Sequence, residues 1–374
     1  MRIREVGFTV LRHALARRYG DAQGLKTHRT TLLVRIDTED GPTGWGDISN
    51  TRNDVNTVHL RQARELLIGA DPLVAGPLVR SLGIFGTRIA AGIDVALADI
   101  RGRTAGMSLA TLFGGAHRRA QPCYASLQNA NDDEDVTASA VAEAETAIRL
   151  GFRHLKMKVG WHHPDVDAHW INAVLAALPS DMSLAIDANR VLDLASAERL
   201  VRGIAQPDRI SWFEEPCGNR HPELYRELRS RIAIPVAGAE SMPLPMIEQV
   251  IAGRMMDIVQ PDLIGHGGFA AMLHMLALCD MHGVRLVPHC FDGQIMRVAT
   301  LHLLASRPDW EEQHGCYPAA PLEVDISPNP VRDELLGGRL CPDADGKIPV
   351  PVGPGLGLAV NEDYVRSAGT AVPL

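Results

Sequence analysis

Seven ionisable residues recur along the second part of the chain at intervals of about one strand–helix unit. They are Lys158, Asp187, Glu214, Glu240, Asp262, His289 and Glu312, with spacings of 29, 27, 26, 22, 27 and 23 residues. Most of them end a short apolar run. One charged residue at a strand end is usually a helix cap or a solvated loop residue, but seven in register are hard to explain in that way. Because buried charges without partners are costly, the pattern predicts a metal or substrate site.

The central three residues of this series are carboxylates. Asp187, Glu214 and Glu240 fall on three successive units. Three converging carboxylates would repel one another unless a cation lay between them. An all-oxygen set of ligands suits Mg²⁺ better than Zn²⁺. We therefore predict that these three residues bind Mg²⁺.

Two further pairs have the chemistry of acid and base catalysts. Lys156 and Lys158 are two residues apart on a predicted strand and share a face, so each is expected to lower the pKa of the other toward that of a general base. The alternative, a surface strand edge protected by lysines, fits poorly with the apolar neighbours. Asp262 and His289 lie on adjacent units, where the carboxylate could fix the imidazole tautomer. The alternative for His289 is a core histidine with its hydrogen bonds satisfied.

The elements that carry these residues alternate in type. After residue 120, short apolar runs alternate with helical stretches about eight times. The runs cover residues 123–127, 154–159, 183–187, 210–214, 235–239, 257–260 and 285–288, with a weaker one near 311–316. Eight such units predict a (β/α)₈ barrel of the TIM type, whose active site lies at the carboxyl ends of the strands. An open doubly wound sheet is the alternative, but no glycine-rich nucleotide turn follows the first strand.

The rest of the chain has a different sequence pattern. Strand and turn signals fill the first 50 residues, and helical periodicity runs from about residue 58 to 113. The tail from Cys341 is rich in proline and glycine and reads as an extended segment that returns to another part of the molecule. We predict two closely packed domains, because no flexible linker separates them.

Composition and charge exclude several classes of protein. The 374 residues include 46% hydrophobic residues and carry a net charge of −8, with no basic stripe that would suit nucleic acid. No apolar stretch reaches 18 residues, which argues against a membrane protein. The first residues do not resemble a secretory signal, and the six scattered cysteines fit reduced thiols, so we expect a cytoplasmic protein. An anionic substrate would need a local cation or a metal to hold it.

Together these residues resemble the enolase superfamily, in its mandelate racemase branch of acid-sugar dehydratases and racemases. The resemblance rests on motifs over nearly the whole chain: Gly44-Trp-Gly-Asp47, Ile93–Asp99, Lys156-Met-Lys158, Asp187-Ala-Asn189, Glu214-Glu-Pro216, Gly238-Ala-Glu240, Gln260-Pro-Asp262, Pro288-His289 and Gly353–Gly357. It implies an α+β capping domain over residues 1–120, completed by 345–374, above a barrel over 121–344.

The resemblance also implies roles for the site residues. Asp187, Glu214 and Glu240 would be the Mg²⁺ ligands. Lys158, tuned by Lys156, would be one acid/base group, and His289, supported by Asp262, the other. Glu312 would hydrogen-bond the substrate carboxylate from the eighth strand, with its neighbour Glu311 as the alternative.

One departure separates the chain from the muconate-cycloisomerase-like branch. Members of that branch carry a lysine at the end of the sixth strand, and no lysine lies near Ile264 here. The resemblance therefore disfavours dipeptide epimerases and muconate-type cycloisomerases.

Polar segments suggest the kind of substrate. The loop Arg17–Gly24, which includes Tyr19 and Asp21, and the segment 50–53 would contact it together with Asn189. Polar contacts suit a polyhydroxylated acid, although solvated loops would look the same.

We expect Mg²⁺-dependent removal of the proton α to a carboxylate, dehydrating an aldonate or aldarate to a 2-keto-3-deoxy acid. A racemase, epimerase or sugar-lactone cycloisomerase is the alternative, and a non-catalytic sugar-acid-binding protein is less favoured. A homo-oligomer is expected.

Overall fold

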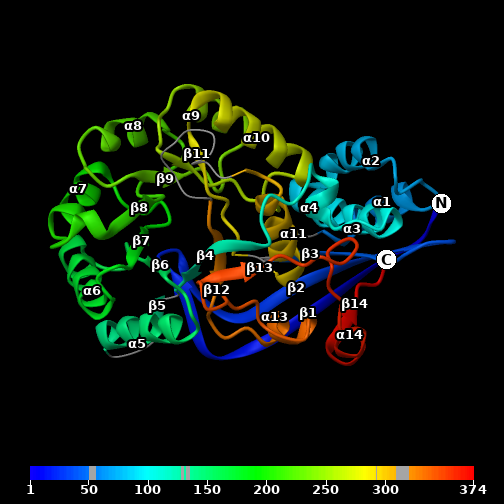
Figure 1. Cartoon of the computed structure of the whole chain (residues 1–374), viewed down its shortest axis with the longest axis horizontal. Coiled ribbons are helices and arrows are strands. Elements are labelled where there is room, and N and C mark those ends of the chain that lie inside the picture. Colours follow the sequence, from blue (N-terminus) through cyan, green and yellow to red (C-terminus); the bar gives the residue numbers. More distant parts are fainter. Residues whose placement is uncertain (50–55, 128–129, 132–134, 292, 309–319) are drawn as a thin grey trace.

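A computed structural model describes the chain except for residues 50–55, 128–129, 132–134, 292 and 309–319. Two sheets organise it. One is an antiparallel sheet near the N-terminus, which we call the cap, and the other is a parallel sheet that curves into a barrel (Figure 1). In the described residues, no helix has the length and apolar character needed to cross a membrane.

The cap sheet is built around a long hairpin. Strand β1 (Ile3–Asp21) pairs with β2 (Gly24–Thr38), which pairs with β3 (Gly44–Ser49). Strand β5 (Ala130–Asn131) joins β1 at Tyr19 and Gly20. The segment that we predicted as a loop from Arg17 to Gly24 is therefore mostly strand, because Tyr19 pairs with Lys26 and only the tip turns.

The barrel sheet contains eight parallel strands, which confirms the predicted fold. They are β4 (Ala120–Ser126), β6 (His154–Lys158), β7 (Ser183–Asp187), β8 (Ile210–Glu214), β9 (Val236–Gly238), β10 (Ile258–Val259), β11 (Arg285–Leu286) and β12 (Leu322–Asp325). Their hydrogen-bonded order is β11-β10-β9-β8-β7-β6-β4-β12. Strand–helix alternation produces such a curved parallel sheet because each helix covers the sheet's outer face.

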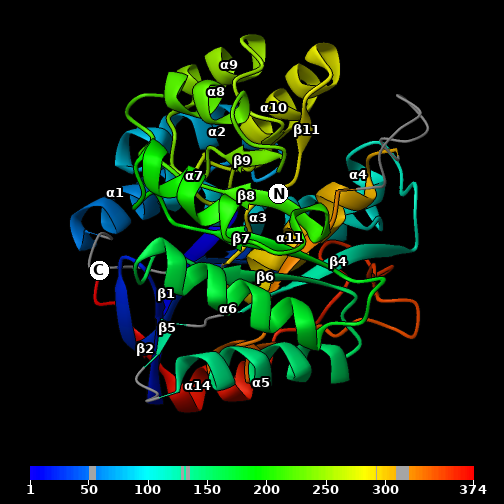
Figure 2. The same cartoon turned by 90° about the vertical axis from the view of Figure 1, so that its left-hand side faces the viewer.

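Helices cover both parts. The cap and its junction with the barrel contain α1 (Thr57–Leu67), α2 (Ala75–Leu82), η1 (Gly83–Phe85), α3 (Thr87–Ala105) and α4 (Leu109–Leu112). The barrel helices are α5 (Val136–Arg149), α6 (Pro164–Ala177), α7 (Leu194–Arg202), η2 (Pro207–Arg209), α8 (Glu223–Arg229), α9 (Leu244–Ala252), α10 (Phe269–His282), α11 (Gln294–Ala305) and α13 (Pro330–Leu335). Figure 2 shows α5 to α10 around the outside of the strands.

A compact apolar layer fills the barrel below its mouth. It consists of Tyr124, Ala185, Trp212, Ala237, Ile258 and Val287, all nearly or completely buried. The Tyr124 and Trp212 rings meet edge to face with centroids 5.3 Å apart, a favourable arrangement for aromatic pairs. The polar residues above this layer therefore rest on a packed floor.

The tail serves both parts of the molecule. Strand β13 (Lys347–Pro349) pairs with β4 of the barrel, whereas β14 (Gly369–Ala371) pairs with β1 of the cap. Helix α14 (Glu362–Ala368) lies beside β14 (Figure 1). The returning tail thus joins the two sheets, while domain limits at residues 120 and 345 stay a prediction.

Close backbone packing explains the motif Gly44-Trp-Gly-Asp47. A Cβ atom at Gly44 or Gly46 would collide with carbonyl oxygens of α3, so the glycines let this helix lie directly on β3. Asp47 is completely buried and accepts hydrogen bonds from the backbone N–H groups of Ile295 and Met296, at the start of α11. The motif therefore fastens the cap to a barrel helix.

A second acid fastens the cap to the neighbouring helix. Asp94 of α3 accepts a hydrogen bond from the N–H of Phe269, the first residue of α10. Gly268 permits this approach, since a Cβ there would collide with the Asp94 carboxylate, and its φ is 106°. A third acid, Asp99, accepts bonds from Trp45 and from Leu356 of the tail. Buried cap carboxylates thus dock α10, α11 and the tail.

Candidate active site

The predicted polar residues gather at the carboxyl ends of the barrel strands, which we call the mouth. Lys158, Asp187 and Glu214 end β6, β7 and β8 side by side, because Lys158 is the register partner of Asp187 and Asp187 that of Glu214. Glu240 follows β9, and a bridge joins Asp262 to His289 beyond β10 and β11. The geometry fits a TIM-barrel active site.

Both lysines of β6 bind carboxylates inside the mouth. The Nζ of Lys156, which is completely buried, lies 2.6 Å from Glu214 Oε1 and 2.8 Å from Glu323 Oε1. The Nζ of Lys158 donates to Asp187 Oδ2 at 2.5 Å. The two ammonium groups therefore share a face, as their spacing predicts.

The predicted depression of the lysine pKa values is wrong for this structure. Burial disfavours the charged form of Lys156, but Glu214 and Glu323 outweigh it and raise its pKa well above the usual value. Burial and the repulsion from Lys156 lower the pKa of Lys158, but Asp187, Glu214 and Asp21 together outweigh them and raise it. The expected repulsion exists, but the attraction of the carboxylates exceeds it. A carboxylate that binds a cation raises a nearby lysine's pKa less strongly.

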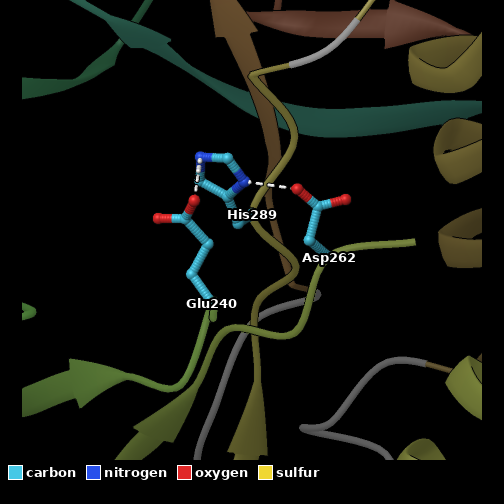
Figure 3. Close-up of side chains that lie close together, drawn as sticks. All are labelled: Glu240, Asp262 and His289. Atoms are coloured by element: carbon cyan, nitrogen blue, oxygen red, sulfur yellow. Dashed lines mark hydrogen bonds and ion pairs between the residues drawn. The ribbon is translucent and has the colours of Figure 1, made fainter. Parts of the chain in front are cut away.

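His289 lies between two carboxylates (Figure 3). Its Nδ1 lies 2.9 Å from Asp262 Oδ2, and its Nε2 lies 3.7 Å from Glu240 Oε1. Burial opposes protonation, yet Glu240, Glu323 and Asp262 together raise the pKa of His289 well above its usual value. Asp262 also accepts N–H bonds from Ile264 and Gly265, which fix its orientation. The predicted aspartate–histidine pair is therefore present.

The predicted metal ligands do not converge on one point. Among the described residues, the one set of three potential ligand residues with atoms within 4.8 Å of one another is Glu240, Asp262 and His289, which shares only Glu240 with the predicted trio. Asp187 and Glu214 instead contact the two lysines, and Glu214 Oε2 accepts bonds from Trp212 and Gln260. The trio occupies three successive strand ends, but its roles stay a prediction.

The charges of the mouth nevertheless fit a divalent cation. Six carboxylates face it: Asp187, Glu214, Glu215, Glu240, Asp262 and Glu323. Against them stand Lys156, Lys158 and Arg190, so negative charge remains unmatched even when His289 is protonated. Burial, together with the charges of Asp187 and Glu323, raises the pKa of Glu214 to about 7 against the attraction of Lys156. In the described residues, the buried amide oxygens of Asn189 and Gln260 also have no hydrogen-bond partner. An oxygen-binding hard cation suits this environment.

Unusual backbone conformations flank the same carboxylates. Asn189, Glu215 and Ala239 have φ angles of 45°, 40° and 84°, in a region that residues other than glycine rarely adopt. Each lies within two residues of a predicted metal ligand. Such conformations cost about 1–3 kcal/mol each and concentrate at functional sites.

The eighth strand provides a residue that we did not predict. Strand β12 pairs with β4, and Glu323 on it is completely buried, accepting the N–H of Cys290 as well as contacting Lys156. Glu311 and Glu312 lie outside the described residues. The strand that completes the barrel begins at Leu322, later than the predicted run near 311–316. The alternation in Leu322-Glu-Val-Asp325 could have revealed it.

The predicted substrate residues occupy different places. Asn189 lies at the mouth, where its backbone oxygen accepts a bond from Gln23 of the hairpin tip. Asp21 lies near the mouth, since its charge contributes to the raised pKa of Lys158. Tyr19 instead lines a cleft of about 530 Å³ beside α5 and the segment after β12. The segment 50–53 lies outside the described residues.

Comparisons with known proteins agree with this architecture. Residues 15–114 match the mandelate racemase / muconate lactonizing enzyme N-terminal domain, and residues 139–364 match the enolase C-terminal domain-like family. The chain is 33% identical to D-galactarolactone cycloisomerase of Agrobacterium fabrum, over 97% of each chain. It is 30% identical to L-talarate/galactarate dehydratase of Salmonella typhimurium, over 91% of this chain and 83% of the relative.

A solved structure has the same fold. A variant of L-talarate/galactarate dehydratase, liganded with Mg and L-glucarate, superposes with a TM-score of 0.83 and 26% identity, covering 99% of this chain and 93% of that one. Together the two domain matches span both the cap and the barrel. The chain belongs to the mandelate racemase branch of the enolase superfamily.

Proposed function

We propose that this protein is an Mg²⁺-dependent enzyme that removes the proton α to a carboxylate, and that it dehydrates a sugar acid to a 2-keto-3-deoxy acid. One observation carries the proposal. Lys158 on β6 and the His289–Asp262 pair beyond β10 and β11 flank the carboxylates that end β7, β8 and β9. A substrate bound at these carboxylates through a cation would therefore have an acid/base group on either side.

Asp187, Glu214 and Glu240 would hold the Mg²⁺, as oxygen ligands from successive strand ends. When bound, the ion would supply Lewis-acid stabilisation of the negative charge that develops on the substrate carboxylate. The bound Mg of the 26% identical dehydratase structure supports this assignment. The completely buried Lys156 would place a second positive charge beside the same carboxylates.

The acid and base roles follow from position. Lys158 would take the α-proton on its Nζ once Asp187 binds the cation, because the carboxylate would then favour the charged form of Lys158 less strongly. His289 would donate a proton from Nε2 to the leaving β-hydroxyl, since Asp262 holds its Nδ1. Glu323 would hold the Lys156 ammonium group in place beside the substrate carboxylate, since it lies 2.8 Å from the Lys156 Nζ. These steps need both groups within reach of one substrate.

Cycloisomerisation of a sugar lactone is the second candidate. It uses the same groups and is favoured by the 33% identity with a D-galactarolactone cycloisomerase. The two reactions differ in whether a hydroxyl group or a ring ester oxygen leaves.

The test is a panel of aldonates, aldarates and their lactones, incubated in D₂O with Mg²⁺. We expect exchange of the α-proton with at least one substrate, followed by NMR as loss of its signal. A new 2-keto-3-deoxy acid would identify dehydration, and lactone opening would identify cycloisomerisation. Treatment with a chelator should abolish both, and added Mg²⁺ should restore them. Absence of exchange across the whole panel would contradict the proposal.

We also propose that the protein assembles as a homo-oligomer through the α1–η1 face of the cap. Apolar side chains there are unusually exposed: Val58 (50%), Ile68 (45%), Val74 (52%) and Ile84 (78%). Light scattering should show more than one chain per particle, and Ile84→Glu should reduce that number.

We further propose a cytoplasmic location. It is consistent with the five free cysteines described, and thiol alkylation after cell fractionation would test it.

A further inference from the structure

A buried arginine of the cap lies above the eighth strand. Arg29 belongs to β2, and its side chain is 8% exposed. It donates to Ser327 Oγ, and its Nη2 lies 3.8 Å from Asp325 Oδ2, which is longer than a hydrogen bond. Its Nε is buried and, within the described part of the chain, has no hydrogen-bond partner. Burying an arginine donor without a partner is costly, so this group calls for a ligand.

The negative charge of Asp325 is shared between Arg29 and a second arginine. Arg332, also buried, lies 3.1 Å from Asp325 Oδ2 and donates to its backbone oxygen as well. Asp325 Oδ1 accepts bonds from the N–H and hydroxyl of Ser327. Arg29 and Arg332 therefore share the negative charge of Asp325, and Arg29 makes the longer of the two contacts, without a direct hydrogen bond to the carboxylate.

The position of Arg29 is on the inner side of the barrel. Asp325 is two residues after Glu323 on β12, so the two side chains leave the same face of the strand. Glu323 faces inward, because it contacts Lys156. Asp325 therefore lies about 7 Å further along the strand than Glu323, from a rise of about 3.3 Å per residue, and Arg29 lies beside Asp325.

An aromatic ring fixes the guanidinium near the acid/base pair. The Cζ of Arg29 lies 5.4 Å from the ring centre of Phe291, which is two residues after His289. The Nζ of Lys26, also on β2, lies 5.3 Å from the same ring. Stacking orients the planar guanidinium and leaves its edge donors available. Two cap cations thus surround this side of the mouth, whereas the β7–β9 side is rich in carboxylates.

We propose that Arg29 binds a second carboxylate at the far end of the substrate, so that the enzyme prefers a dicarboxylic sugar acid over the corresponding aldonate. This inference rests on the proposed function. One carboxylate of the substrate binds beside the β7–β9 acids, and the other reaches the cap, where the guanidinium donates two parallel hydrogen bonds to its oxygen atoms. An aldonate offers a neutral hydroxyl group in place of that carboxylate.

The experiment compares galactarate with galactonate, which differ only in the group at C6. Dissociation constants are measured by titration calorimetry with Mg²⁺ on protein that carries Lys158→Met, which prevents turnover. The protein with Arg29 should bind galactarate about 10- to 100-fold more tightly than galactonate, the range expected for hydrogen bonds between charged groups. Arg29→Gln should reduce this preference to less than threefold.

Arg35→Gln is the matched control. Arg35 lies on the same strand and stacks on Trp45 at 5.3 Å, but it pairs with Asp37 and Glu362 on the exposed side of the cap. This variant should keep the full preference. If Arg29→Gln does not fold, Arg29→Lys keeps the charge without the planar fork and should show an intermediate preference.

The results separate the two proposals. Equal binding of both acids by the protein with Arg29, or an unchanged preference in a folded Arg29 variant, would overturn the role of Arg29. If the preference exists but wild type exchanges no α-proton, the proposed reaction fails while the binding role of Arg29 stands. If exchange of the α-proton occurs without the preference for galactarate, the proposed reaction stands and the role of Arg29 fails.

Discussion

Asp47 of the cap and Asp187 of the mouth are both almost completely buried, yet their environments differ in kind. Burial raises the pKa of Asp47 to about 7, because its partners are mainly two backbone N–H groups, with a weaker influence from Arg297. Burial acts on Asp187 in the same direction, but Lys158 and Lys156 reverse it and lower its pKa to about 2.

This difference separates docking from chemistry. The partial charges at the start of α11 hold the Asp47 carboxylate in place without an ion pair. Asp187 instead interacts with the full positive charges of Lys158 and Lys156, and a metal ion or a substrate can take the place of these partners. A buried acid alone is therefore no sign of an active site, and the nature of its partners decides the role.

The largest expected effect is the loss of activity when a charged residue of the mouth is replaced. Replacing Lys158 by Met removes the proposed base, and kcat for α-proton exchange should fall by about 10³-fold, within the range for general acid–base catalysis. The variant also loses the ion-pair partner of the buried Asp187, so its folding should be verified by circular dichroism before the rates are compared. Lys347→Met, at an exposed position of β13, is the control and should retain full activity. More than a tenth of wild-type activity in Lys158→Met would rule out this role.

Asp262→Asn should have the next largest effect. The amide cannot hold the His289 tautomer as the carboxylate does, so kcat for dehydration should fall by about 10²-fold. The pH profile should also change, because a carboxylate no longer supports protonation of His289. An unchanged profile with a uniformly lower rate would indicate a structural role instead.

On the docking side, Asp47→Ala should destabilise the fold and leave two N–H groups of α11 unpaired. We expect a loss of about 2–6 kcal/mol, from about 1–3 kcal/mol for each of the two buried unsatisfied groups. Denaturant unfolding measures it, with Asp40→Ala at an exposed cap position as the control. Loss of activity without loss of stability would contradict the docking role.

The same carboxylate predicts a pH dependence of stability. The pKa of Asp47 is about 7 in the folded chain and near 3.8 when unfolded, so the folded state binds the proton more tightly between these values. The stability contributed by this group should therefore fall as pH rises from about 4 to 7, and stay level above that. The difference in melting temperature between wild type and Asp47→Asn should follow this course. If the melting temperature of wild type instead rose relative to that of Asp47→Asn as pH increases, the prediction would be wrong.

Much of the architecture could be predicted from the sequence, because the strand–helix period recurs with little variation. Spacings of 22–29 residues located Lys158 through His289 at their strand ends. The same rule failed at the last strand, since Glu323 lies 34 residues after His289 and the rule selected Glu312.

Other features depend on contacts between distant parts of the chain. The raised pKa values of Lys156 and Lys158 come from carboxylates on other strands, whose distances no local pattern contains. The docking role of Asp47 depends on α11, about 250 residues away in sequence. The position of Arg29 above β12 likewise follows from how the cap lies on the barrel.

The fastening of the cap to α10 and α11 bears on how such enzymes diversify. These two helices follow the strands that lead to Asp262 and His289, so a cap exchanged by recombination would have to present acids to both helix starts. The tip of the β1–β2 hairpin, from Asp21 to Gly24, instead contacts the mouth, where Gln23 donates to the backbone oxygen of Asn189. Substitutions at the tip can therefore alter substrate preference while leaving the attachment of the cap unchanged, which makes the tip the natural target for directed evolution.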